Sequence, residues 1–229
     1  MVTFPGFPAE TLSFLRGLRA NNTRVWFDAH RDQYELFYVT PAREFVVAAG
    51  EVLATFAPGV RAEPRILGSI FRVNRDTRFS PDKRPYKDHI DFWFWEGERK
   101  TAISGFFLRL APELVGLGAG CHGFDPRQLA AYRAAACDPA VGRELLRAME
   151  PVQDAGYAID GVRYQRLPRG FEASAPGNHH LLKYGGLFVH HDLRETDATD
   201  GVLLMDACER HWRVLAPLHR WLVDHVQHS

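Results

Sequence analysis

The segment from Phe71 to His89 gathers cationic side chains in a chain whose formal net charge is zero at pH 7. Residues 72–87 carry only two carboxylates, Asp76 and Asp82. The cations of the same stretch are Arg72, Arg75, Arg78, Lys83, Arg84 and Lys87. Arginine offers phosphate or carboxylate a planar fork of donors, and lysine adds a compact charge. This combination is typical of a site for a polyanionic ligand.

The expected ligand is a phosphorylated small molecule, a nucleotide, a sugar phosphate or a nucleic-acid end. Asn, Asp, Thr, Ser and Pro between Asn74 and Pro85 predict an irregular loop, in which a turn near 74–77 would let the arginines converge. Phe79 and Tyr86 either anchor this loop to the core or stack on a base. The candidate ligand-binding residues are Arg72, Arg75, Arg78, Lys83, Tyr86, Lys87, Arg166 and Lys183.

Catalysis is not indicated by any recognised signature, since the chain has no G-x-S-x-G, P-loop or H-E-x-x-H motif. Whether the protein is an enzyme stays open, and no catalytic residue is assigned. If there is turnover, we expect phosphoryl or phosphodiester chemistry. Asp76, Asp82 or Asp91 would then hold Mg²⁺, because cations stabilise the charge of a transferring phosphoryl group.

Two alternatives stand beside ligand binding. In the first, the protein is a non-catalytic structural or interaction protein. Its Arg/Asp loop is then an ion-paired brace, and the aromatic stretch 92–95 packs on a partner or a second subunit. A brace pairs each arginine within the fold, whereas a ligand site leaves donors unpaired. In the second, one residue of His179-His180 and one of His190-His191 bind a metal together with Asp91 or Asp192, since adjacent strand residues face opposite sides.

Three further polar motifs have simpler explanations. Residues 118–123 read GAGCHG, which fits G-x-G-x-x-G by letter, but a helix rather than a strand-helix-strand unit follows, so a glycine-rich strand end or turn is favoured. Asn21-Asn22 is typical of a helix stop followed by the next cap. His30 is either a general base or a histidine hydrogen-bonded at a helix boundary.

Composition places the chain among ordinary globular proteins, with 46% hydrophobic and 24% charged residues. We expect a single domain over residues 1–229. Three cysteines far apart predict neither a disulfide framework nor a zinc knuckle, which favours the cytoplasm. No signal peptide or membrane span is expected, and a near-neutral pI argues against bulk binding to nucleic acid. The oligomeric state stays undetermined.

The pattern of elements predicts an α+β fold, an antiparallel sheet flanked by N-terminal, central and C-terminal helices. Helical periodicity fills the first quarter, where Pro41 opens a helix, and Asp125-Pro126 and Asp138-Pro139 each predict a helix start. A long amphipathic helix spans 200–226. Strands are expected at 66–73, 89–95, 101–110, 157–166 and 187–193, with a hairpin at 96–99.

The segment 71–87 also carries a family resemblance. Its pattern FRxxRDxRFSxDKxPYK resembles that of the uncharacterised family catalogued as domain of unknown function 2461, and the likeness runs from Phe4 to about Val226. It includes FLxxLxxNNxxxWFxxHRxxY at 14–34, PRGF at 168–171 and LLK at 181–183. The resemblance implies a family and no activity. Two departures are Asp88, which weakens the positive field beside Lys87, and Phe106-Phe107, which replaces frequent tyrosines and argues against phenolic catalysts.

Overall fold

The computed structural model describes residues 3–101, 103–170, 176–193 and 198–227. These residues form two compact units, each described by itself. Unit 1 is Met1–Phe94, Phe107–Leu117 and Asp192–Glu209, and unit 2 is Trp95–Phe106, Gly118–His191 and Arg210–Ser229. The expectation of a single domain stays a prediction.

The strands form one antiparallel sheet in the order β1-β2-β3-β4-β6-β5. They are β1 (Val60–Arg61), β2 (Ile90–Glu96), β3 (Gly105–Ala111), β4 (Leu114–Cys121), β5 (Asp160–Val162) and β6 (Tyr184–Leu193). The last two pair in antiparallel register, Asp160 with Phe188 and Val162 with Tyr184. Helices precede, interrupt and follow these strands along the chain, so the predicted α+β class is confirmed.

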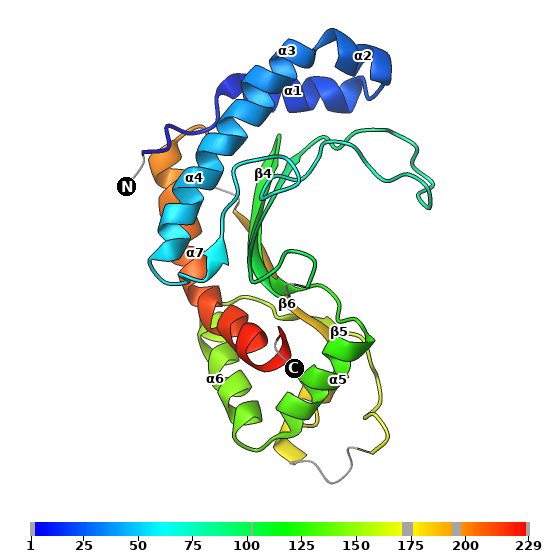
Figure 1. The fold of residues 1–229 in the computed structure, drawn as a ribbon, viewed down its shortest axis with the longest axis vertical. Helices are drawn as coiled ribbons and strands as arrows, with labels where there is room; N and C mark the ends of the chain where they lie inside the picture. Colours follow the sequence, from blue (N-terminus) through cyan, green and yellow to red (C-terminus); the bar gives the residue numbers. More distant parts are fainter. Residues whose placement is uncertain (1–2, 102, 171–175, 194–197, 228–229) are drawn as a thin grey trace. The chain divides into compact units, whose positions relative to one another are not determined.

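The helices of unit 1 come from both ends of its sequence (Figure 1). They are α1 (Ala9–Ala20), α2 (Arg24–Ala29), α3 (Arg31–Tyr34), the π-helical turn η1 (Glu35–Val39), α4 (Thr40–Ala54) and the first part of α7 (Gly201–Leu222). Pro41 lies in the first turn of α4, as predicted, although the chain enters that turn from the π-helical residues of η1 rather than from a loop. No helix in the described part of the chain is long and apolar enough to cross a bilayer.

The core of unit 1 explains which residues β2 exposes. Ile90, Phe92 and Phe94 are at most 1% exposed, and the ring of Phe92 lies 4.7 Å from that of Phe45 on α4. Asp91 and Trp93, between them, are only partly buried. Because successive strand residues face opposite sides, these two project from the face of β2 that does not pack on α4. The strand predicted at 89–95 is therefore confirmed as β2, with buried and partly buried side chains alternating over residues 90–94.

Unit 2 contains the two helices that the Asp-Pro pairs predicted, α5 (Pro126–Cys137) and α6 (Val141–Asp154). Asp125 forms a reciprocal capping box with Gln128. Asp138 accepts hydrogen bonds from the N–H groups of Ala140 and Val141 at 2.8 and 2.9 Å. Short 3₁₀ turns follow at η2 (Pro176–Asn178) and η3 (Leu181–Lys183), and a π-helical turn η4 (Val223–Gln227) ends α7.

Residues 118–121 of the glycine-rich stretch complete β4, in agreement with a strand end rather than a dinucleotide-binding loop. Gly120 has a φ of +116°, and a Cβ there would meet the Leu187 carbonyl oxygen at 2.2 Å. The glycine is required by this close approach of backbone from β6.

Some boundaries differ from the expectation. Residues 66–73 make only isolated bridges, Ile66 with Ile70 and Ile70 with Phe92, because Leu67 turns the chain with a φ of 65°. The connection after β2 is longer than the predicted hairpin at 96–99, since β3 begins at Gly105. The strand expected at 157–166 is reduced to β5. Sequence reading missed β4, whose four-residue end GAGC has low strand propensity.

Candidate functional site

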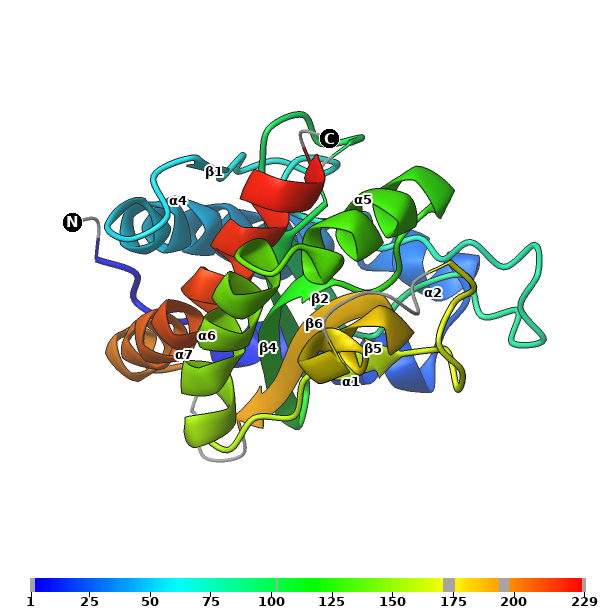
Figure 2. The same ribbon diagram turned by 90° about the horizontal axis from the view of Figure 1, so that it is seen from below.

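Residues 72–87 form a narrow two-stranded extension of unit 1, called here the arm. Asn74 pairs with Tyr86 in an antiparallel bridge, Arg75 N–H donates to the Pro85 carbonyl and Lys87 N–H to the Val73 carbonyl, both at 2.8 Å. Figure 1 shows α4 on one side of the strands of unit 1 and the arm extending on the other side. Figure 2 shows the same long projection from a second direction. The arm thus carries its side chains away from the core.

The base of the arm is held by a side-chain amide. Asn22 donates to the Tyr86 carbonyl and accepts from the Tyr86 N–H, both at 3.0 Å, as a neighbouring strand would. The Tyr86 ring is 7% exposed and stacks on Phe27 at 4.3 Å. Tyr86 therefore anchors the arm to α2, the first of the two roles considered for it.

The expectation for Asn21-Asn22 is half right. Asn21 ends α1, and its side-chain amide donates to the Gly17 carbonyl at 3.0 Å. The cap of α2 is Thr23, however, whose hydroxyl accepts from the Trp26 N–H. Asn22 instead forms its hydrogen bonds with Tyr86, which is so distant in the sequence that no local pattern could indicate the pairing.

Two carboxylates shape the arm by ion pairing. Asp82 binds Arg75 and Arg84, each at 2.8 Å, and Arg75 also donates to the Arg84 carbonyl at 3.1 Å. Asp76 binds Arg78 at 2.7 Å. Hydrogen bonds from Arg78 lower the pKa of Asp76 to about 2, and those from Arg84 and Arg75 lower the pKa of Asp82. Arg75 and Arg84 therefore meet on the Asp82 carboxylate, whereas the convergence of Arg72 with Arg75 through a turn near 74–77 stays a prediction.

Other side chains of the arm face solvent. Arg72 is exposed and makes no hydrogen bond or ion pair within the described residues. The Lys83 ammonium donates only to the Thr77 carbonyl, at 2.9 Å. The Arg78 side chain is 77% exposed and lies 5.8 Å from the ring centroid of Phe79, which is itself 93% exposed. These residues form the outward surface of the arm.

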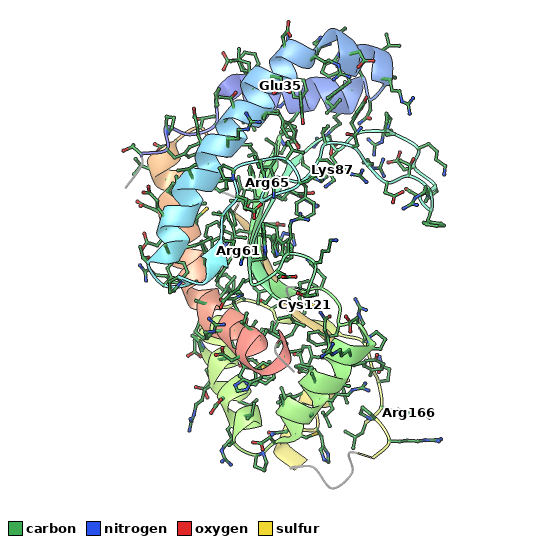
Figure 3. All side chains as sticks on the ribbon, in the orientation of Figure 1. Glu35, Arg61, Arg65, Lys87, Cys121 and Arg166 are labelled. Carbon is green, nitrogen blue, oxygen red and sulfur yellow. The ribbon has the colours of Figure 1, made fainter. Side chains whose placement is uncertain are left out.

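The sheet face beside the arm adds a second charged cluster. The Asp91 carboxylate lies 2.8 Å from Lys87 Nζ, 2.7 Å from Arg109 Nε and 3.3 Å from His89 Nε2. Burial acts to raise the pKa of Asp91, but hydrogen bonds from His89 and Arg109 outweigh it and lower the pKa. Lys87, labelled in Figure 3 where the arm meets the strands, also lies 4.9 Å from the ring centroid of Phe71.

Sequence reasoning missed Arg109. Its position between Leu108 and Leu110 in β3 marks it as facing away from the core, since both leucines are 1% exposed. That signal was available in the sequence. The sequence does not identify Asp91 as the partner of Arg109, because the register between β2 and β3 decides which residue lies opposite.

Cations outnumber carboxylates over the arm and this face together. Seven cationic side chains, counting Arg109, accompany only Asp76, Asp82 and Asp91. The Asp88 carboxylate binds Arg19 at 2.7 Å and His89 at 3.1 Å, and its effect on the field at Lys87 stays a prediction. The surface keeps an excess of positive charge after its own ion pairs are made.

Arg166 and Lys183 belong to unit 2. Arg166 is exposed on the segment after β5, where Figure 3 labels it. Lys183 is half-buried at the end of η3, and its carbonyl accepts from the N–H groups of Arg163 and Tyr164 at 2.9 and 3.0 Å. Their participation in a site on unit 1 stays a prediction.

Within the described part of the chain, the histidines of the two pairs lie in different surroundings. His190 is exposed on β6, whereas the ring of His191 stacks on His211 at 5.1 Å and lies 4.7 Å from Tyr157. Across residues 3–101, 103–170, 176–193 and 198–227, no three His, Cys, Asp or Glu side chains are grouped to hold a metal ion. The His30 ring stacks on the Trp26 ring at 4.0 Å, and His30 Nδ1 forms a hydrogen bond with the Trp26 carbonyl oxygen at 2.7 Å. This contact agrees with the second role considered for His30, a histidine hydrogen-bonded at a helix boundary.

Comparison with known proteins identifies one family for this chain. Neither the curated proteins nor the solved structures contain a match to this chain. The model of one family, described as conserved hypothetical protein DUF2461, matches residues 10–221. This span contains the arm, the sheet and nearly all of α1 and α7. The chain therefore belongs to the DUF2461 family of conserved hypothetical proteins.

Proposed function

We propose that unit 1 binds a polyanionic, phosphate-bearing ligand along the arm and the adjoining face of β2 and β3. One observation carries this proposal, namely seven cationic side chains against three carboxylates on this surface. Phosphate groups would supply the missing negative charge, and arginine is suited to bind them through paired donors.

The cations divide into two groups by their contacts. Arg75, Arg84 and Lys87 are held by Asp82 or Asp91 and give the arm its shape. Arg72 and Lys83, which no carboxylate holds in the described residues, and the largely exposed Arg78 are placed to meet a ligand. We expect the second group to set affinity and the first to set stability.

The brace alternative has its own support. Arg75 is the least exposed arginine of the arm's ion pairs, with 24% of its side chain accessible, and both of its partners lie within the arm. If every cation of the arm served only to pair with groups of the fold, as Arg75 does, the arm would hold its shape and bind no anion. The two functions therefore differ in what the outward cations do.

We propose binding rather than phosphoryl transfer. The carboxylates considered for Mg²⁺ already accept from cationic side chains, Asp76 from Arg78, Asp82 from two arginines, and Asp91 from Lys87 and Arg109. A divalent ion would have to displace these donors. Phosphoryl or phosphodiester chemistry accordingly stays a prediction from sequence.

Thermal unfolding with inorganic tripolyphosphate tests the proposal. A ligand at one hundred times its dissociation constant adds about 2.7 kcal/mol, which is roughly 5–10 °C for a chain of this length. We expect this shift to be lost in Arg72→Ser/Arg78→Ser, whose Tm without ligand stays near that of the wild type. Arg75→Ala should instead lower the Tm without ligand.

Arg31→Ser is the matched control, since Arg31 is also exposed, lies in unit 1 outside the arm and pairs with Asp28. Its variant should keep the tripolyphosphate shift. Absence of any shift in the wild type, together with a lower Tm in Arg75→Ala, would replace the binding proposal with the brace.

A further inference from the structure

Among the described residues of unit 1, the most exposed large apolar side chain lies in the arm. Phe79 is 93% exposed, and the Arg78 guanidinium lies 5.8 Å from its ring centroid. The chain turns here, with Ser80 N–H donating to the Thr77 carbonyl at 3.4 Å. A single exposed ring is common on protein surfaces, so Phe79 points to a ligand only together with the cations that surround it.

Aromatic rings also accompany the cations on the sheet face. Phe71 is half-buried beneath the Lys87 ammonium. Trp93 is half-buried two residues beyond Asp91, on the face that carries the Asp91 to Arg109 ion pair. Rings and cations therefore occur together at both the tip and the base of the arm.

The spacing of these groups is long. Arg72 and Phe79 are seven residues apart in the sequence, a separation of at most about 23 Å at roughly 3.3 Å per residue. A small phosphorylated molecule would contact one end of this surface and leave the other unused. A flexible polymer of alternating phosphates and planar groups would contact both.

We infer that the polyanion is single-stranded nucleic acid, with a base stacked on Phe79 and phosphates on the outward cations of the arm. The inference rests on the proposed function and specifies its ligand. Proteins that bind single strands combine a cationic track with aromatic side chains on which bases stack, and every base has a face that can stack. Paired bases in a duplex do not offer these faces, so a duplex would use the cations alone.

Fluorescence anisotropy with a short labelled oligothymidylate tests the inference. Loss of one stacked base weakens binding roughly 5- to 100-fold, which is the effect expected of Phe79→Ala. The same variant should bind an abasic oligomer of equal length like the wild type and should keep its Tm. Phe79→Trp should restore the affinity. Val25→Ala is the matched control, since Val25 is 82% exposed on α2 and should have no effect.

The outcomes separate the two proposals. If oligothymidylate and the abasic oligomer bind equally and Phe79→Ala binds both like the wild type, the stacking inference is overturned while polyanion binding stands. Tighter binding of a duplex, a lowered Tm of Phe79→Ala, or a dimer that depends on Phe79 in sedimentation would each overturn the inference as well. If neither oligomer nor tripolyphosphate binds, both proposals fail.

Discussion

Asp91→Asn should weaken the fold and strengthen anion binding at the same time. The Asp91 side chain is 15% exposed and pairs with Lys87 and Arg109, whose side chains are 20% and 50% exposed. Losing one partner of a fully buried ion pair costs about 3–5 kcal/mol, and an exposed pair contributes about 0–1 kcal/mol. This pair lies between the two limits, so we expect a loss of about 1–3 kcal/mol, or roughly 3–10 °C in Tm.

The effect on affinity has the opposite sign. Asparagine keeps the size of the side chain but removes one negative charge beside Lys87. A unit charge about 6 Å from a phosphate contributes roughly 0.7 kcal/mol in water, which is about threefold in affinity. Tripolyphosphate should therefore bind about threefold more tightly at low salt, and added salt should reduce the gain.

The pH dependence of stability follows from the lowered pKa of Asp91. An unfolded aspartate takes up its proton near pH 3.9, whereas the folded carboxyl does so at lower pH. The contribution of Asp91 is complete above the unfolded pKa and is lost as the pH falls through the folded pKa. The Tm difference between wild type and Asp91→Asn should be full at pH 7 and shrink in strong acid.

Asp28→Asn is the control for this comparison. It removes the same charge from an exposed pair of unit 1, in which Asp28 and Arg31 are 58% and 68% exposed. Its Tm should change by little, because exposed pairs contribute little. Two results would refute the reasoning about Asp91. Unchanged stability would show that the cluster does not hold the sheet face, and a joint loss of stability and affinity would show that the carboxylate itself contacts the ligand.

Two further predictions concern the base of the arm and the stacked rings of His191 and His211 in unit 2. Asn22→Ala removes both amide contacts to Tyr86 and should cost about 1–3 kcal/mol, with faster hydrogen exchange at the Tyr86 amide, whereas Asn21→Ala should leave that exchange slow. Burial, followed by the charges of His191 and Arg210, lowers the pKa of His211 to about 4. The unfolded histidine binds a proton near pH 6.5, so the Tm should fall as the pH is lowered from 6.5 to 4. His211→Gln should make this fall shallower. An equal dependence of Tm on pH in both proteins would contradict the assignment to His211.

Local sequence determined the elements whose causes lie within a few residues. The Asp125 capping box forms because both partners lie in one turn. The alternation at 90–94 fixed which side chains of β2 enter the core, and therefore that Asp91 would face away from it. The family pattern of 71–87 likewise needs only the order of the residues.

Tertiary structure decided what these elements contact. Asn22 and Tyr86 are separated by 64 positions, and Asp91 and Arg109 by 18. Each pairing depends on how α2, the arm and the strands of unit 1 pack. The charge count of the arm came from the sequence, but the division into braced and outward cations did not. An ion pair requires its two groups within about 4 Å, and only the folded backbone sets that distance.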